Sequence, residues 1–136
     1  MSRKYPEIPV LLVDNEEHFL TSTKATLRLH GVTNVDCCQD SRELMPLLEE
    51  KGFSLILLDL IMPHIGGEKL MPEIVEKYPN LKVIILTADD VQPTPVKYYK
   101  EKGAFDYISK SFEIHQLIDI IRRAFKEPVS EYGQKD

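Results

Sequence analysis

The sequence is poor in cysteine, and its two cysteines, Cys37 and Cys38, are adjacent in the chain. Neighbouring residues of an extended segment point to opposite faces, so these two thiols are poorly placed to bridge each other. No Cys-x-x-Cys pair and no histidine cluster accompanies them, which argues against a metal or redox centre built on cysteine. We therefore expect two reduced thiols in a strand.

Long apolar runs and an excess of positive charge are also lacking. No apolar stretch approaches the length that crosses a bilayer, and residues 1–6 contain no apolar segment typical of a secretory signal. The formal net charge is −5, which disfavours binding of nucleic acid through a basic face. These features predict a cytoplasmic location, with no membrane contact and no direct nucleic-acid binding by this chain.

The length and composition suit one domain. The chain has 136 residues, of which 43% are hydrophobic, and this is enough to build a proper core. We place the domain at residues 8–126. Residues 127–136 are polar and include Pro128 and Gly133, so they are expected to form a loose tail or the start of a linker.

Five short apolar segments alternate with five segments of helical periodicity. The segments at 10–13 and 55–58 are continuously apolar, as in strands buried on both faces of a sheet. Five strand-then-helix units predict an α/β fold, a single flavodoxin-like (βα)5 domain with a parallel sheet in the order 2-1-3-4-5 and helices on both faces. Strands are expected at 10–13, 34–38, 55–58, 81–86 and 105–109, and helices at 17–30, 40–51, 67–78, 95–102 and 112–125.

Local signals predict several helix ends. Asp40 and Glu43 match a capping box. Pro46 falls inside the helix that follows, where it should remove a hydrogen bond. Thr94 and Pro95 suit the cap and the first position of the short helix at 95–102.

A polar residue follows or ends four of the predicted strands. These residues are Asp14, Asp59, Thr87 and Lys110. The predicted strand order makes the four strands neighbours, and the carboxyl ends of parallel strands share one edge, where ligands bind. We therefore expect the four side chains to meet in one pocket.

This set of side chains indicates phosphoryl chemistry. Carboxylate and amide oxygens are hard ligands that suit Mg²⁺ better than zinc or copper. A lysine can follow a phosphoryl group as a mobile charge, and a threonine hydroxyl can donate to one of its oxygens. A carboxylate among them can attack phosphorus and hold the group as an aspartyl phosphate.

Four motifs resemble those of the receiver domains of two-component response regulators. They are Val-Asp-Asn-Glu at 13–16, Leu-Asp-Leu-Ile-Met-Pro at 58–63 followed by Gly67, Thr-Ala at 87–88, and Tyr-Ile-Ser-Lys at 107–110. Each motif is weak alone, but all four in order at the ends of predicted strands are specific. The resemblance covers nearly all of residues 8–126.

The resemblance implies a role for each residue of the predicted pocket. Asp59 would accept a phosphoryl group from a histidine of a sensor kinase, as a 4-aspartylphosphate. Asp14, Asn15, Asp59 and the main-chain carbonyl of Ile61 would hold Mg²⁺. Lys110 and Thr87 would contact the phosphoryl group, and Thr87 would form the switch pair with Tyr107.

The resemblance also implies how the signal leaves the domain. Phosphorylation would change the surface formed by residues 95–102, 105–109 and 112–125, and so control an output domain or a separate partner, for instance in transcription. The same surface could form a homodimer. The chain would be a phosphoacceptor signalling domain and not an enzyme with a separate substrate, although it could catalyse its own phosphorylation and dephosphorylation.

Two residues depart from the family pattern. Many receivers have Asp at the position of Asn15, so one negative charge is missing from the expected metal site, and weaker Mg²⁺ binding and a changed phosphoryl lifetime are expected. Ser111 stands where the family usually has proline, often after a cis bond. A non-proline cis bond costs about 3 kcal/mol, and the sequence leaves open whether the Lys110–Ser111 peptide is cis or trans.

Other interpretations remain open at this point. Tyr107 could be ordinary half-buried packing in a strand. The combination of strand-end Asp, Thr and Lys with Mg²⁺ also occurs in small phosphatases of the haloacid dehalogenase type, although these have an Asp-x-Asp motif after the first strand, where this chain has Asp14 and Glu16. A receiver-like scaffold that no longer accepts phosphate is a third possibility, suggested only by Asn15.

Overall fold

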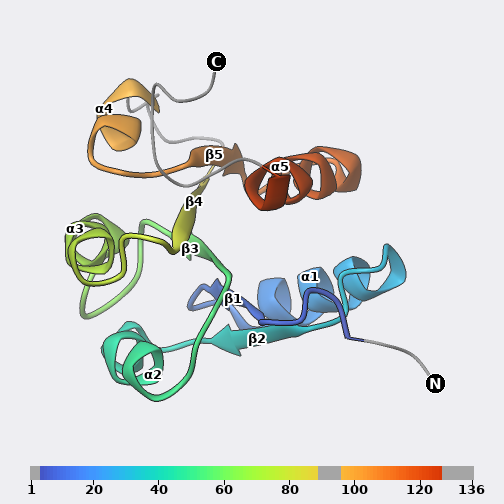
Figure 1. Ribbon diagram of the computed structural model, residues 1–136, viewed down its shortest axis with the longest axis horizontal. Coiled ribbons are helices and arrows are strands. Elements are labelled where there is room, and N and C mark those ends of the chain that lie inside the picture. The colour runs from blue at the N-terminus through green and yellow to red at the C-terminus, as the bar shows by residue number, and fades with distance from the viewer. Residues whose placement is uncertain (1–3, 89–95, 127–136) are drawn as a thin grey trace.

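Five parallel strands form one sheet in the order β2-β1-β3-β4-β5, with helices on both sides (Figure 1), which confirms the predicted fold. The computed structural model describes residues 4–88 and 96–126, without the side chains of 96 and 97. The strands are β1 (Val10–Val13), β2 (Val35–Cys38), β3 (Leu55–Asp59), β4 (Lys82–Thr87) and β5 (Asp106–Ser109). The helices are α1 (Glu17–Leu29), a short 3₁₀ helix η1 (Ser41–Glu43), α2 (Leu44–Glu50), α3 (Gly67–Lys77), α4 (Val96–Glu101) and α5 (Ile114–Lys126).

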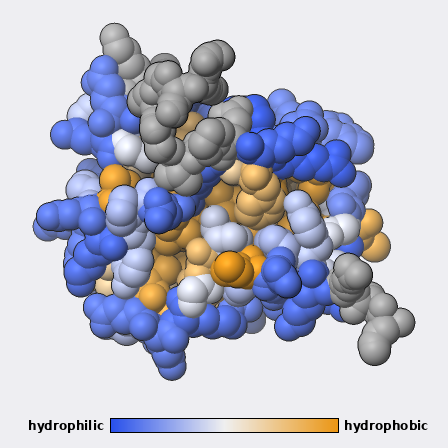
Figure 2. All heavy atoms as spheres, in the orientation of Figure 1, coloured by the Kyte–Doolittle hydropathy of each residue, from blue (hydrophilic) through white to orange (hydrophobic). Residues whose placement is uncertain are grey.

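The sheet is covered on both faces because its central strands are apolar on both. Every residue of β1 and β3 is buried, and alternate residues enter two different core clusters. One cluster packs Leu12 and Leu57 against α1 and α5, and the other packs Leu11 and Ile56 against α2 and α3. In Figure 2 the apolar residues gather in the middle of the visible face, between hydrophilic residues at its margins.

The strand register brings the polar ends of the strands to one edge. Val13 lies opposite Leu58, so Asp14 and Asp59 extend from adjacent strands at the same level. Thr87 lies opposite Ser109, immediately before Lys110. The strand order is as predicted, and it brings the strand ends that carry these residues to the carboxyl edge of the sheet.

The second helical segment differs from the prediction. The Asp40 side chain accepts a hydrogen bond from the backbone N–H of Arg42 and caps η1, so the predicted capping box through Glu43 is wrong. The α-helix begins only at Leu44, which makes Pro46 its third residue. The first N–H groups of a helix have no partner within it, so this proline costs no helical hydrogen bond, contrary to the prediction.

Other boundaries move by one or two residues. The last helix begins at Ile114, not at residue 112, because the backbone N–H of Phe112 bonds back to the Ser109 carbonyl in a turn. Gly31 follows α1 with a φ of +92°, which suits a residue without a side chain. Thr94 and Pro95, the predicted start of α4, lie outside the described residues.

The two cysteines are free, as expected. Cys37 is exposed and Cys38 is buried, in agreement with the alternation of side chains along β2. In the part of the chain that the structure describes, no helix is both long and apolar enough to cross a membrane.

Gly67 allows α3 to begin directly against the end of β3. A Cβ atom at this position would lie 2.4 Å from the Asp59 carbonyl oxygen and 2.8 Å from Leu60 Cα. We expect Gly67→Ala to lower the free energy of unfolding by about 2 kcal/mol, because backbone would have to shift to admit the methyl group. Urea denaturation measures this, with Gly52→Ala as the control, since a Cβ there meets nothing within 4 Å; equal effects of the two substitutions would contradict the prediction.

Candidate functional site

Two carboxylates are buried side by side at the carboxyl edge of the sheet. Asp14 directly follows β1 and Asp59 is the last residue of β3. Asp14 is 0% exposed and Asp59 is 5% exposed. Buried acidic groups are costly unless a counter-charge or hydrogen bonds accompany them.

Lys110 supplies the counter-charge. Its Nζ lies 2.8 Å from Asp14 Oδ2 and 3.7 Å from Asp59 Oδ2. Glu16 Oε1 is 3.6 Å away at the exposed side, and the Phe19 ring lies beneath the ammonium, 4.7 Å from centroid to Nζ. We refer to Asp14, Asp59 and Lys110 as the strand-end cluster.

The two carboxylates are held in the same manner. In each, Oδ1 accepts a hydrogen bond from the backbone N–H two residues further on: from Glu16 to Asp14 at 2.9 Å, and from Ile61 to Asp59 at 3.2 Å. This leaves both Oδ2 atoms directed at the ammonium. Among buried side-chain atoms of the described residues, Asp14 Oδ2 alone accepts no well-aligned hydrogen bond, although the ammonium is near.

Burial and charge change the proton affinities of the cluster. Burial, and then the nearby charge of Asp14, raise the pKa of Asp59 to about 6, against the opposing effect of Lys110 and the Ile61 N–H. Burial opposes the charge of Lys110, but the contact with Asp14 and the charges of Asp59, Asp14 and Glu16 together raise its pKa above the ordinary value. Lys110 is therefore charged at neutral pH, whereas Asp59 titrates close to neutrality.

The donor set fits Mg²⁺. Two carboxylate Oδ2 atoms of adjacent strands face one point, and one of them lacks a proper hydrogen bond; hard anionic oxygens in this state suit a small divalent cation. No group of three or more His, Cys, Asp or Glu side chains could hold a metal in the described residues. The remaining protein ligands would have to be an amide or main-chain oxygen, as at Asn15 and Ile61.

The structure places Asn15 and Ile61 beside the cluster. The Asn15 backbone carbonyl accepts a hydrogen bond from Gln39 Nε2 at 3.2 Å, and Asn15 lines a shallow groove next to the site. The Ile61 side chain is 65% exposed, while its N–H is held by Asp59. Their part in metal binding stays a prediction.

Thr87 and Tyr107 lie on the neighbouring strands β4 and β5. The Thr87 backbone carbonyl accepts a hydrogen bond from the Lys110 N–H at 2.7 Å, which joins the ends of β4 and β5. Tyr107 is 43% exposed, so in this structure its ring faces solvent and is not part of the packed core. The role of the two residues as a switch pair stays a prediction.

The loop after Lys110 adopts a trans arrangement. Among the described residues the single cis peptide is Tyr5–Pro6, so the Lys110–Ser111 bond is trans. The Ser111 N–H donates to Ser109 Oγ at 3.1 Å, and proline at 111 could not make this bond. Serine at this position therefore gives the loop a local contact of its own.

Two contacts of the cluster were not predicted from the sequence. Phe19 lies on α1 and meets Lys110 through the ring face, and Glu16 extends the negative charge outward. Glu16 stands in the motif at 13–16, which is a usable signal. The contact between Phe19 and Lys110 has no signal in the sequence, because it depends on how α1 packs near the residue that follows β5.

The comparisons with known proteins agree with this geometry. The model of the response regulator receiver domain matches residues 10–122. Response regulator protein FleR of Pseudomonas aeruginosa is 35% identical over 115 residues, 84% of this chain and 24% of FleR. The DNA-binding transcriptional regulator NtrC of Rhizobium meliloti is 39% identical over 119 residues, 88% of this chain and 24% of NtrC. The chain thus spans about a quarter of the length of these relatives.

A solved structure is similar over nearly the whole domain. The beryllofluoride-activated NtrC4 receiver domain dimer has a TM-score of 0.78 and 29% sequence identity, and the match covers 87% of this chain and 96% of that chain.

Proposed function

This chain belongs to the response regulator receiver domain family of two-component systems, and we propose that Asp59 is its phosphoacceptor. The observation that carries the proposal is the strand-end cluster, in which Asp59 Oδ2 and Asp14 Oδ2 face one ammonium at 3.7 and 2.8 Å. Asp59 is the better acceptor because it is slightly exposed whereas Asp14 is fully buried. The match spans residues 10–122 and so includes every residue of the cluster.

The transfer follows from the charges at the site. Asp59 Oδ2 attacks phosphorus, the O–P bond forms, and the P–N bond to the donor histidine breaks with its electron pair left on nitrogen. With a pKa of about 6, most of Asp59 is ionised above pH 7 and can act as the nucleophile. Lys110 then neutralises a phosphoryl oxygen, and the Thr87 hydroxyl donates to another. Asp14, Asn15, Asp59 and the Ile61 carbonyl would hold Mg²⁺, whose charge offsets that of the phosphoryl group.

The output is a changed surface at α4, β5 and α5. Once the phosphoryl group is in place, Thr87 moves toward it and the Tyr107 ring, now 43% exposed, turns inward. A local charge thereby biases an element with two states. A sensor histidine kinase is the donor. The surface at α4, β5 and α5 could also form a homodimer, and the NtrC4 receiver domain is itself a dimer.

The controlled activity is transcription. FleR and NtrC are regulators about four times the length of the matched segment, and NtrC is a DNA-binding transcriptional regulator. We infer that this chain controls an output domain of that class, either in the same polypeptide or in a separate effector.

Intact mass spectrometry tests the proposal. Incubation with Mg²⁺ and acetyl phosphate should add about 80 Da, one phosphoryl group on a carboxylate, to the wild type and to Asp119→Ala, a substitution of an exposed acidic residue on α5. Asp59→Ala should gain nothing. An adduct on Asp59→Ala would overturn the assignment.

A phosphate-release assay, together with the same mass measurement, separates the alternatives. Sustained release of phosphate from a phosphomonoester, without a stable adduct, would indicate a phosphatase of the haloacid dehalogenase type. A wild type that takes up no phosphoryl group from acetyl phosphate would indicate a receiver-like scaffold.

Asn15 sets the affinity for the metal ion. We expect Asn15→Asp to tighten Mg²⁺ binding by about tenfold, because an added anionic ligand raises the attraction for a divalent cation. Isothermal titration calorimetry on both proteins measures this, with Asn80→Asp as the control that makes the same exchange at an exposed position shortly before β4. Equal affinities of wild type and Asn15→Asp would contradict the prediction.

A further inference from the structure

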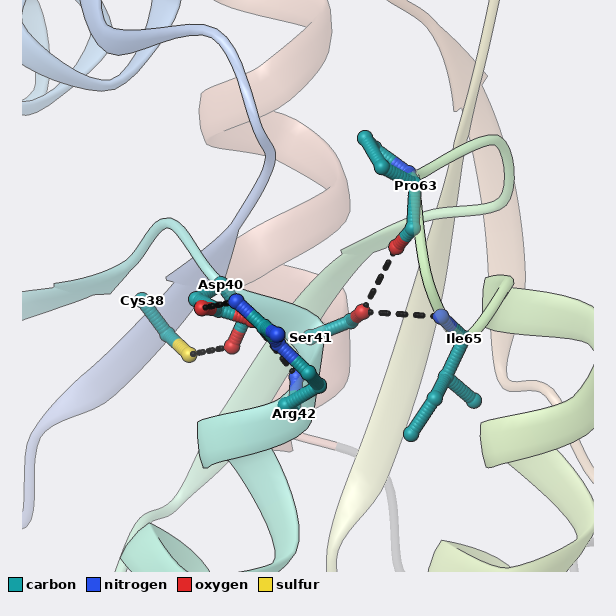
Figure 3. A network of polar contacts seen from close by, with 6 residues as sticks. All are labelled: Cys38, Asp40, Ser41, Arg42, Pro63 and Ile65. Carbon is teal, nitrogen blue, oxygen red and sulfur yellow. Dashed lines mark hydrogen bonds and ion pairs between the residues drawn. The ribbon is translucent and has the colours of Figure 1, made fainter.

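Ser41 joins two loops at the carboxyl edge of the sheet. Its side chain is 3% exposed, and its hydroxyl donates to the Pro63 carbonyl at 3.0 Å and accepts from the Ile65 N–H at 3.2 Å. Ser41 belongs to η1, whereas Pro63 and Ile65 belong to the loop between β3 and α3 (Figure 3). One buried hydroxyl of η1 therefore bonds the residues on both sides of His64 in the loop between β3 and α3.

That turn contains a strained residue. His64 lies between the two contacts of Ser41 and has a φ of +71°, a left-handed conformation that costs free energy for a residue with a side chain. Such a conformation persists only where its surroundings impose it. The paired contacts to residues 63 and 65 are the constraint that the structure provides.

The same contacts determine where Ile61 lies. Its side chain is 65% exposed and gives no anchorage, so its backbone is positioned from either side. On one side its N–H is bound to Asp59 Oδ1; on the other, Met62 is buried and the Pro63 carbonyl is bound to Ser41. If the contact at residue 63 is lost, the segment after Ile61 is held near the site by the burial of Met62 alone.

The segment that carries Ser41 is itself stiffened. Asp40 accepts from the Arg42 backbone N–H at 2.9 Å and pairs with the Arg42 guanidinium through both oxygens. The buried Cys38 thiol donates to the Asp40 carbonyl at 3.3 Å. Figure 3 shows these contacts on one side of Ser41 and the turn at 63–65 on the other.

We propose that Ser41 is a positioning residue for the Asp59 site: by holding the turn at residues 63–65, its hydroxyl keeps the Ile61 main-chain carbonyl where Mg²⁺ requires a ligand. The inference rests on the proposed function, because it assumes a metal ion between Asp59 and this carbonyl. Groups that orient a metal ligand without touching the metal commonly affect affinity strongly.

The test compares two serines whose hydroxyls bond backbone carbonyls: Ser41, which contacts the loop after β3, and Ser54, which directly precedes β3. Ser41→Ala removes the hydrogen bonds of the Ser41 hydroxyl to residues 63 and 65, which we call the Ser41 clamp. Ser54→Ala removes the contacts of Ser54 Oγ to the Ile8 and Pro9 carbonyls at 2.7 and 3.2 Å. Calorimetric titration with Mg²⁺ alone should show affinity about tenfold weaker for Ser41→Ala and unchanged for Ser54→Ala. Amide NMR shifts of Ile61, Met62, His64 and Ile65 should change in Ser41→Ala without added metal.

Two results would overturn the inference. One is equal Mg²⁺ affinity in wild type and Ser41→Ala; the other is an equal loss in both serine variants, which would show general destabilisation. If Ser41→Ala does not fold, Ser41→Cys keeps the volume with a weaker donor and acceptor and is judged by the same comparisons. Failure of the proposed function appears separately, as absence of a phosphoryl adduct on the wild type.

Discussion

Asp59→Asn is expected to stabilise the unmodified domain, by about 3 kcal/mol at pH 8. Asp59 has a pKa of about 6 in the folded protein against an ordinary value of 3.8, and each unit of that difference corresponds to about 1.4 kcal/mol. Asparagine removes the buried charge but keeps an oxygen that can accept from the Ile61 N–H. Urea denaturation of both proteins measures the gain.

The pH dependence gives the sign of the effect. Below about pH 3 Asp59 is protonated in both the folded and the unfolded chain, so its ionisation costs the fold nothing. Between the ordinary pKa of 3.8 and about 6, the unfolded chain is ionised while the folded Asp59 still holds its proton, so the native state loses stability as the pH rises. The advantage of Asp59→Asn should therefore grow between pH 4 and pH 7 and then level off.

The control for this result is Asp119→Asn, an exposed substitution on α5. It should change the free energy of unfolding by no more than about 0.5 kcal/mol at any pH in the range. An advantage of Asp59→Asn that is constant with pH, or a loss of stability at pH 8, would show that the folded protein does not raise the pKa of Asp59.

Lys110→Met is expected to have the opposite effect, a loss of about 3 kcal/mol at pH 8. The substitution leaves Asp14 and Asp59 buried with no cation between them, and removing one partner of a buried ion pair typically costs this much. The loss should shrink toward pH 5, where Asp59 takes up a proton. The yield of phosphoryl adduct should also fall, by about tenfold or more, because no ammonium is left to neutralise a phosphoryl oxygen.

Two further variants identify the cause. Lys77→Met removes a lysine whose contact with Glu49 is long, at 3.5 Å, and exposed, so it should cost less than about 0.5 kcal/mol. The double variant Asp59→Asn with Lys110→Met should be more stable than the sum of the single effects predicts, because the two side chains share one interaction. Additive effects would contradict a direct coupling between Lys110 and Asp59.

On the proposed function, these expected results describe a site prepared for phosphorylation. The unmodified domain holds an acidic side chain at a raised pKa because the carboxyl edge of the sheet is nearly dry and Asp14 lies beside it. Burying Asp59 lowers the stability of the domain. Part of this loss is the cost of holding the proposed nucleophile Asp59 close to its counter-charge, Lys110. Preorganised charge of this kind requires little rearrangement when the phosphoryl group arrives.

The sequence by itself determined the fold and the membership of the strand-end cluster. Short continuous apolar runs that alternate with helical segments indicate buried strands of a covered parallel sheet, and the register of such a sheet places Asp14, Asp59 and the start of the Lys110 loop at one edge. Helix starts were less well predicted: Asp40 satisfies the N–H of Arg42 two residues on rather than that of Glu43, a choice between two local hydrogen bonds of similar strength.

The tertiary structure alone decided how the cluster is charged and held. A pKa near 6 for Asp59 depends on how completely the folded chain excludes water from this carboxylate and on the charge of Asp14 beside it. The contact of Phe19 with Lys110 and the clamp from Ser41 to residues 63 and 65 join segments far apart in the chain. Sequence spacing specifies which residues share a strand end; burial and contacts between loops appear only when the helices are packed against the sheet.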